Sequence, residues 1–150
     1  MPHDPEVHAF LLRHLQAIFA NDIEGYHATT SEDLTLYEWW VTPHRLDGQP
    51  FHDFVLTENA KRGTVFGAES KADVGRETIH TRFDLANMHI QRYGDTAIAS
   101  YTLLVSSGTP DGVEVAAHNE SRVMVKQDRQ WKVVHVHKSP AWPAPHVQPR

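Results

Sequence analysis

Apolar side chains recur every three or four positions near the N-terminus and at every second position in later stretches of the chain. Residues 5–20 carry an apolar stripe that predicts an amphipathic helix. Its members are Val7, Phe10, Leu11, Leu15, Ile18 and Phe19. Asp4 and Pro5 fit the start of this helix, because aspartate caps the first amides and proline is favoured at the first helical position.

The next stretches predict a short helix, a strand and a third helix. NDIEGYHATTSED is typical of a turn followed by a short helix, and the alternation in LTLYEWW indicates a strand. TPHRLDGQP is a turn cluster. FHDFVLTENAKRG predicts a helix that ends at Gly63, because glycine is favoured just past a helix end, and AESKADVGRET is expected to be a loop.

Four strand-like runs follow, and they set the fold class. They are HTRFDLANMHIQRYG, TAIASYTLLVSS, VEVAAHNESRVMVKQ and QWKVVHVHKS, with hairpin turns predicted at SSGTPDG and KQDRQ. Helices first and antiparallel strands afterwards indicate an α+β fold, with helices packed on one face of a sheet. The tail, from about residue 139 to 150, contains too many prolines for regular structure and is expected to lie extended.

Composition narrows the class of protein. A chain of 150 residues is expected to form one domain, residues 1–150. The absence of cysteine excludes disulfides and thiolate metal sites. The N-terminus shows no basic segment followed by an apolar run, so neither a signal peptide nor a membrane span is predicted. A net charge of -5 without a basic cluster argues against nucleic acid as a partner. We expect a cytoplasmic protein.

Two basic residues on the last two apolar runs are the first candidates for a site. Arg122 and Lys138 would be costly to bury unless an anion meets them. Because side chains alternate along a strand, Lys138 should share its face with Val136 and Val134. Arg122 should share its face with Glu120 and could form a salt bridge within the sheet.

Glu38 is a further candidate. It is a second potential partner for Arg122, and it is the carboxylate that we nominate as a general base from the first strand. A Glu38 that is free of an ionic partner would favour chemistry, whereas a locked pair would favour binding or structure.

The two histidines beside Lys138 raise the question of a metal. His135 and His137 should lie together on the face opposite Lys138 and could chelate an ion. Two ligands are not enough, and a third would have to come from His80, His89 or His118. We therefore predict a surface or interface histidine pair and no metal.

Three stretches together resemble one known family. FANDIEGYHATTSEDLTLYE, GQPFHDF and NESRVMVKQDRQWKVVHVHKSPA are similar to the association (hub) domain of calcium/calmodulin-dependent protein kinase II, over residues 19–144. This domain belongs to the nuclear transport factor 2-like superfamily. The resemblance implies a cone-shaped fold in which a curved sheet wraps around the N-terminal helices and encloses a cavity. Nothing in the chain resembles a Gly-rich nucleotide loop or a kinase catalytic loop, so no kinase activity is expected.

The resemblance also implies site residues. The cavity of the hub family carries a tyrosine, a histidine and three arginines, and it accepts small carboxylates. Tyr26 and His52 match the tyrosine and the histidine, Arg122 matches one arginine, and Lys138 stands in place of a second. The third arginine is missing, since its place falls on Thr102 or Leu104 depending on the point from which it is counted.

Three functions remain open at this stage. The first is a self-associating domain, at least a dimer, that binds a small anionic ligand without a cofactor. The second is an enzyme of the ketosteroid isomerase, dehydratase or hydrolase type, with His52 or Glu38 as the acid/base group. The third is an oligomerisation module without a ligand.

Overall fold

The computed structural model describes residues 4–50, 80–142 and 145 of the chain. Two helices precede six strands. They are α1 (Pro5–Phe19), α2 (Ile23–Thr29), β1 (Thr30–Tyr37), β2 (Leu46–Asp47), β3 (His80–Tyr93), β4 (Thr96–Thr109), β5 (Gly112–Gln127) and β6 (Gln130–Pro140). The predicted third helix and the loop after it fall in residues 51–79, and both lie outside the described residues.

Both helices begin at a capping aspartate. The side chain of Asp4 accepts a hydrogen bond from the amide of Val7, with Pro5 in the first turn, as the sequence predicts for α1. Asp22 accepts in the same way from the amide of Gly25 at the start of α2. Each cap satisfies an amide that has no partner within its own helix, which fixes where the helix begins.

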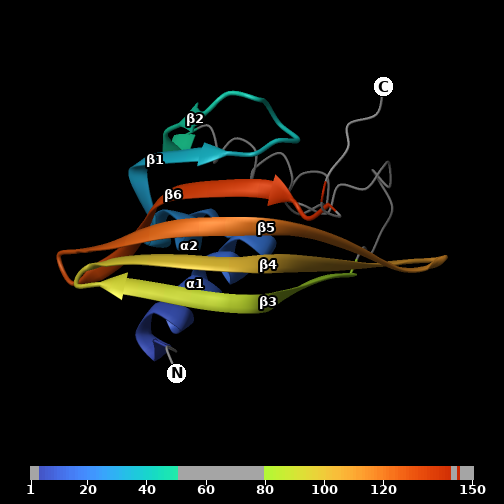
Figure 1. Cartoon of the computed structure of the whole chain (residues 1–150), viewed down its shortest axis with the longest axis horizontal. Coiled ribbons are helices and arrows are strands. Elements are labelled where there is room, and N and C mark those ends of the chain that lie inside the picture. The colour runs from blue at the N-terminus through green and yellow to red at the C-terminus, as the bar shows by residue number, and fades with distance from the viewer. Residues whose placement is uncertain (1–3, 51–79, 143–144, 146–150) are drawn as a thin grey trace.

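The six strands form one mixed sheet in the order β2-β1-β6-β5-β4-β3. Neighbouring strands are antiparallel except for β1 and β6, which run parallel in the middle of the sheet. Both helices lie behind one face of this sheet (Figure 1). The α+β prediction is confirmed.

The core lies between the helices and this face of the sheet. On β4 the buried positions alternate with partly exposed ones, as expected for a strand with one covered face. The buried set on this strand is Ala97, Ala99, Tyr101, Leu103, Val105 and Ser107. From the helices, the stripe predicted for α1 is buried apart from Phe19, which is partly buried and stacks on Phe83 of β3 with ring centroids 4.7 Å apart.

Four local features differ from the sequence prediction. The short strand β2 lies in TPHRLDGQP, which was expected to be a turn. The first strand was expected to run from Leu34 to Trp40, but β1 begins at Thr30 and ends at Tyr37, and the next residues after it form a turn. Where β5 pairs with β6, Val123 lies opposite His135 and Met124 lies opposite Val133. Val134 of β6 is therefore the extra residue of a bulge. β6 also continues through Pro140, which covers the first two residues of the expected tail.

Candidate functional site: a buried charge cluster

Arg122 and Lys138 both point into the covered side of the sheet, from neighbouring strands. Arg122 on β5 is 1% exposed and Lys138 on β6 is 5% exposed. Lys138 shares its face with Val136, as predicted, but Val134 does not belong to that face. The bulge at Val134 shifts the alternation of the strand by one residue. The next buried valine before Val136 is therefore Val133 and not Val134.

Two carboxylates neutralise these two cations. Arg122 Nη1 donates a hydrogen bond to Glu120 Oε1, two residues earlier on the same face of β5. Lys138 Nζ lies 2.9 Å from Glu38 Oε1, just beyond the end of β1, and 3.9 Å from Glu120 Oε2. The suggestion that Glu38 pairs with Arg122 is therefore wrong. Arg122 forms the salt bridge within the sheet, and Glu38 is held by Lys138.

Tyr101 and His118 complete what we call the charge cluster, with Glu38, Glu120, Arg122 and Lys138. The Tyr101 hydroxyl donates to Glu120 Oε1 at 2.6 Å and accepts from Arg122 Nη1 at 2.5 Å. His118 Nε2 lies 2.5 Å from Glu120 Oε2. The carboxylate of Glu120 thus bonds three different side chains and lies within ion-pair distance of a fourth, Lys138, so it is the centre of the charge cluster.

Electrostatics in the charge cluster follow from burial and close charges. Burial alone would raise the pKa of Glu120, but Arg122, Lys138 and His118 outweigh it and hold that pKa well below its usual range. Burial raises the pKa of Tyr101 well above its ordinary value, and the Arg122 charge only partly opposes this. Glu120 is therefore ionised and Tyr101 neutral at pH 7. A carboxylate held this strongly in its ionised form is a poor proton acceptor.

The tryptophan pair, Trp39 and Trp40, covers one side of the charge cluster. Their ring centroids are 4.5 Å apart, and both rings contact His118, at 5.4 and 5.6 Å. Lys138 Nζ lies 5.1 Å from the centroid of Trp40, within range of a cation–π interaction. In a strand two adjacent side chains would face opposite ways, but β1 ends before Trp39 and Trp40, and both rings contact the same histidine.

The other predicted site residues lie elsewhere or cannot be placed. Tyr26, on α2, is buried, and its ring stacks on His14 with centroids 5.9 Å apart. Its ring also lies 6.3 Å from that of His27. His52 lies outside the described residues. Thr102 and Leu104 both alternate with the buried positions of β4, so they face away from the helices.

His135 and His137 lie on the face opposite Lys138, as the alternation predicts. His135 Nδ1 is 2.8 Å from the Thr35 hydroxyl, and the ring of Tyr37 contacts both histidines. His118, which the metal hypothesis needed as one of its alternative third ligands, is bonded to Glu120 on the other face. Within the described ranges, no three His, Cys, Asp or Glu side chains are placed to hold a metal ion.

Comparisons with known proteins agree with this architecture. The family model described as the calcium/calmodulin-dependent protein kinase II association domain matches residues 3–142. A crystal structure of the CaMKII hub of S. rosetta superimposes with a TM-score of 0.70 at 25% identity, covering 94% of this chain and 100% of that one. The CaMKII hub homology domain of Chlamydomonas reinhardtii gives 0.73 at 25% identity, covering 91% and 97%.

Less similar proteins share the fold of this chain. An NTF2-like protein of unknown function from Pseudomonas putida superimposes with a TM-score of 0.69 at 19% identity, covering 93% of this chain and 87% of that one. No helix in the described part of the chain is long and apolar enough to cross a membrane. With a family model matching nearly its whole length, the chain belongs to the CaMKII association (hub) domain family, whose fold is shared with NTF2-like proteins.

Proposed function

We propose that this chain is a self-associating domain whose charge cluster also takes a small carboxylate ligand. Arg122 carries the ligand part of the proposal. Its described hydrogen bonds, to Tyr101 and Glu120, both leave from Nη1, while its buried Nε has no hydrogen-bond partner among the described residues. A buried donor without a partner costs about 1–3 kcal/mol, and a ligand oxygen bound at Nε would recover that cost.

The charges around Arg122 limit the affinity of such a ligand. Arg122 and Lys138 already face Glu120 and Glu38, so a bound carboxylate adds a third negative charge to two positive ones. Since like charges in a buried site repel, we expect a Kd of about 1 mM, or roughly 4 kcal/mol of binding free energy. The predicted ligand-binding set, Tyr26, His52, Arg122 and Lys138, and the cavity around it remain part of this proposal.

The ligand is tested by thermal unfolding with a panel of small aliphatic carboxylates and the matching primary amides. We expect the carboxylates to raise Tm and the amides to leave it unchanged, because a ligand of the native state at 100 times its Kd adds about 2.7 kcal/mol. Arg122→Lys keeps the charge but removes the Nε donor, and it should abolish the shift. Arg45→Lys, at an exposed arginine, is the control. Equal shifts in wild type and Arg122→Lys, or no shift in wild type, would refute the ligand proposal.

Self-association is supported by the family and by the outer face of the sheet, which the helices leave uncovered. Apolar side chains of β4 and β5 gather on this face at positions that alternate with the buried ones. They are Ile98, Leu104, Val113, Val115, Val123 and Val125. Val113 is 72% exposed and Val115 61%, although both are β-branched residues in a strand. These residues form two apolar groups, separated on the same face by the polar pairs Ser100–Ser121 and Thr102–Asn119. Exposed apolar groups of this kind are typical of a protein interface.

Sedimentation velocity tests this surface. Wild type should sediment as a dimer or larger assembly at micromolar concentration, and Val123→Lys should shift it toward the monomer, because a charge buried at an interface must be desolvated. Gln16→Lys on the exposed side of α1 is the matched control. A monomeric wild type, or an assembly unchanged by Val123→Lys, would contradict the proposal.

The enzymatic alternative depends on two residues. Glu38 is bonded to Lys138, and His52 lies outside the described residues. The described contacts therefore favour binding over acid/base chemistry. We also retain, as proposals, one domain over residues 1–150 and a cytoplasmic location.

A further inference from the structure

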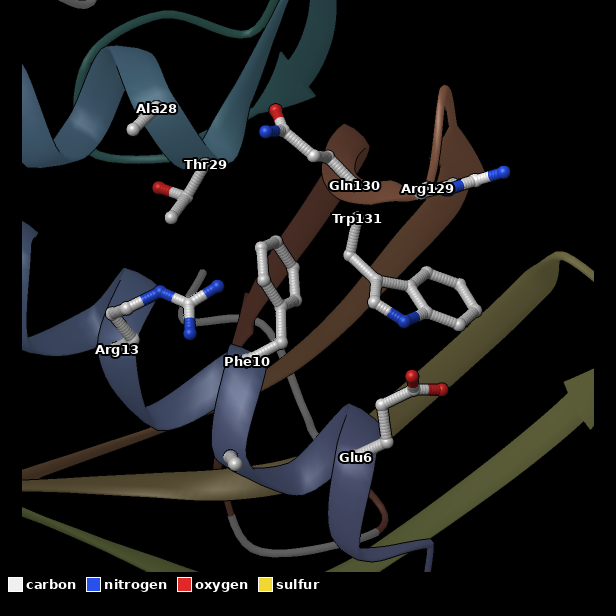
Figure 2. A pocket seen from close by; sticks show the side chains of 9 residues that line it. Glu6, Phe10, Arg13, Ala28, Thr29, Arg129, Gln130 and Trp131 are labelled. Carbon is white, nitrogen blue, oxygen red and sulfur yellow. The ribbon is translucent and has the colours of Figure 1, made fainter.

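A pocket lies away from the charge cluster, between α1, the end of α2 and the turn that joins β5 to β6. It has a volume of about 470 Å³, within the range of small-molecule sites. Nine residues line it, among them Phe10, Arg13, Thr29, Gln130 and Trp131. Figure 2 shows Arg13 and Trp131 on opposite sides of the Phe10 ring, with Gln130 and Thr29 across the opening.

The floor of this pocket is aromatic. Phe10 is 2% exposed and Trp131 6%, so packing in the core fixes both rings. The small exposed part of each ring lines the pocket. The Thr29 hydroxyl is already used, since it donates to Gly25 O at 2.9 Å and lies 2.8 Å from His14 Nδ1. Arg92 and Lys126 lie over the Trp131 ring, at 5.0 and 5.9 Å from its centroid, so the ring surface left to a ligand is small. A flat apolar group fits against the remaining surface, because aromatic rings pack on one another in offset or edge-on arrangements.

The charges at the rim are predominantly positive. The guanidinium of Arg13 lies 5.5 Å from the Phe10 ring centroid, and within the described ranges no carboxylate is in ion-pair distance of it. Arg129 adds a second exposed cation at the rim, directed away from Phe10 (Figure 2). The one acid of the pocket, Glu6, is shared by Arg92 at 2.8 Å and Lys126 at 3.2 Å. In the part of the chain that the structure describes, no carboxylate therefore competes for Arg13, although the whole chain has a net charge of -5.

We propose that this pocket binds an aromatic carboxylate, with the carboxylate on Arg13 and the ring against Phe10 and Trp131. The ion pairs fix this orientation, because Arg92 and Lys126 beside Trp131 are already paired with Glu6, whereas Arg13 has no carboxylate in ion-pair distance within the described ranges. A guanidinium binds a carboxylate through charge-assisted hydrogen bonds, and the Gln130 amide can supply a further donor. The site is independent of Arg122 and of the ligand proposed for the charge cluster.

The test titrates benzoate and 2-naphthoate, each beside its primary amide, into the full chain labelled with ¹⁵N. The indole N–H signal of Trp131, assigned with Trp131→Phe, reports on the pocket. We expect both acids to shift this signal, 2-naphthoate more tightly than benzoate, and the amides at least tenfold more weakly. Arg13→Gln, a surface change that leaves the core intact, should weaken the acids tenfold or more.

Two further variants separate the sites. Arg45→Gln, on a distant surface, and Arg122→Lys, in the charge cluster, should leave the titration of Trp131 unchanged. The proposal is overturned if 2-naphthoate does not shift the Trp131 signal, if Arg13→Gln leaves its Kd unchanged, if the amide binds equally well, or if Arg122→Lys is the variant that abolishes binding.

Discussion

Glu120→Gln is the sharpest test of the charge cluster. Glu120 accepts from Tyr101 and Arg122, contacts His118, and is 3% exposed. The substitution keeps the shape of the side chain but removes the carboxylate that pairs with Arg122, and it leaves Glu38 as the acid that faces Lys138. Removing one partner of a buried ion pair costs about 3–5 kcal/mol, because the other charge stays desolvated. For a chain of this size that corresponds to a fall in Tm of roughly 6–20 °C.

Urea unfolding at pH 7 measures this loss, with Asp47→Asn as the control. Asp47 pairs with Arg45 at 2.6 Å, but the two side chains are 60% and 54% exposed, so its loss should cost no more than about 1 kcal/mol. A loss below about 1 kcal/mol for Glu120→Gln would refute the assignment of Glu120 as the centre of the charge cluster.

Acid unfolding gives the same residue a second signature. The pKa of Glu120 is depressed in the folded protein, so its contribution to stability is complete above the ordinary value of 4.5. It is lost as the pH falls below 4.5 and through the lower folded pKa. Wild type should therefore lose stability more steeply than Glu120→Gln in this range, and parallel curves would contradict the depressed pKa.

Three more predictions concern other parts of the chain. Lys138→Met should destabilise by about 3–5 kcal/mol because it leaves Glu38 buried and charged, and Lys138→Met with Glu38→Gln should recover part of the loss in urea unfolding; equal losses would argue against this pair. Burial and the nearby His137 lower the pKa of His135, so the part of the stability that depends on this residue is full above pH 6.5 and falls below it. His135→Asn should flatten Tm between pH 7.5 and 5.5, and an unchanged slope would contradict this. Asp4→Ala removes the α1 cap and should cost about 1 kcal/mol in thermal unfolding, and a neutral result would be inconsistent with the cap.

Hydrophobic periodicity was enough to predict both described helices and every described strand except β2, which lies in the stretch expected to be a turn. The stripe of α1 and the alternation of β4 reflect burial on one face, and that signal is local in sequence. The bulge at Val134 was not predictable, because an extra residue in one strand depends on how its neighbour pairs with it. The end of β1 was predicted too late because Trp39 and Trp40 are residue types that favour a strand. Their preference for strands does not show where the backbone turns.

The charge cluster was predicted in part. Arg122 and Lys138 were found from the cost of burying a cation, and Glu120 from its place two residues before Arg122. Tyr101 was missed, although the predicted turn at SSGTPDG contains the signal. Pairing outward from Thr109 and Gly112 brings Tyr101 opposite Glu120. The pairing of Glu38 could not be predicted, because it depends on how a parallel strand lies beside β6.

The position of β6 in the sheet has a consequence for how the chain folds. The last strand in the sequence lies between β1 and β5, and its parallel partner β1 is about one hundred residues earlier, as the separation of 100 between Glu38 and Lys138 illustrates. β3, β4 and β5 can zip together as successive hairpins, whereas β1 has no neighbour on that side until β6 has been synthesised. Closing so long a loop is slow, because its entropy must be lost before the new contacts form. A chain cut ahead of Gln130 would therefore lose the strand that joins both halves of the sheet, and the exposed edges of β1 and β5 would be free to aggregate.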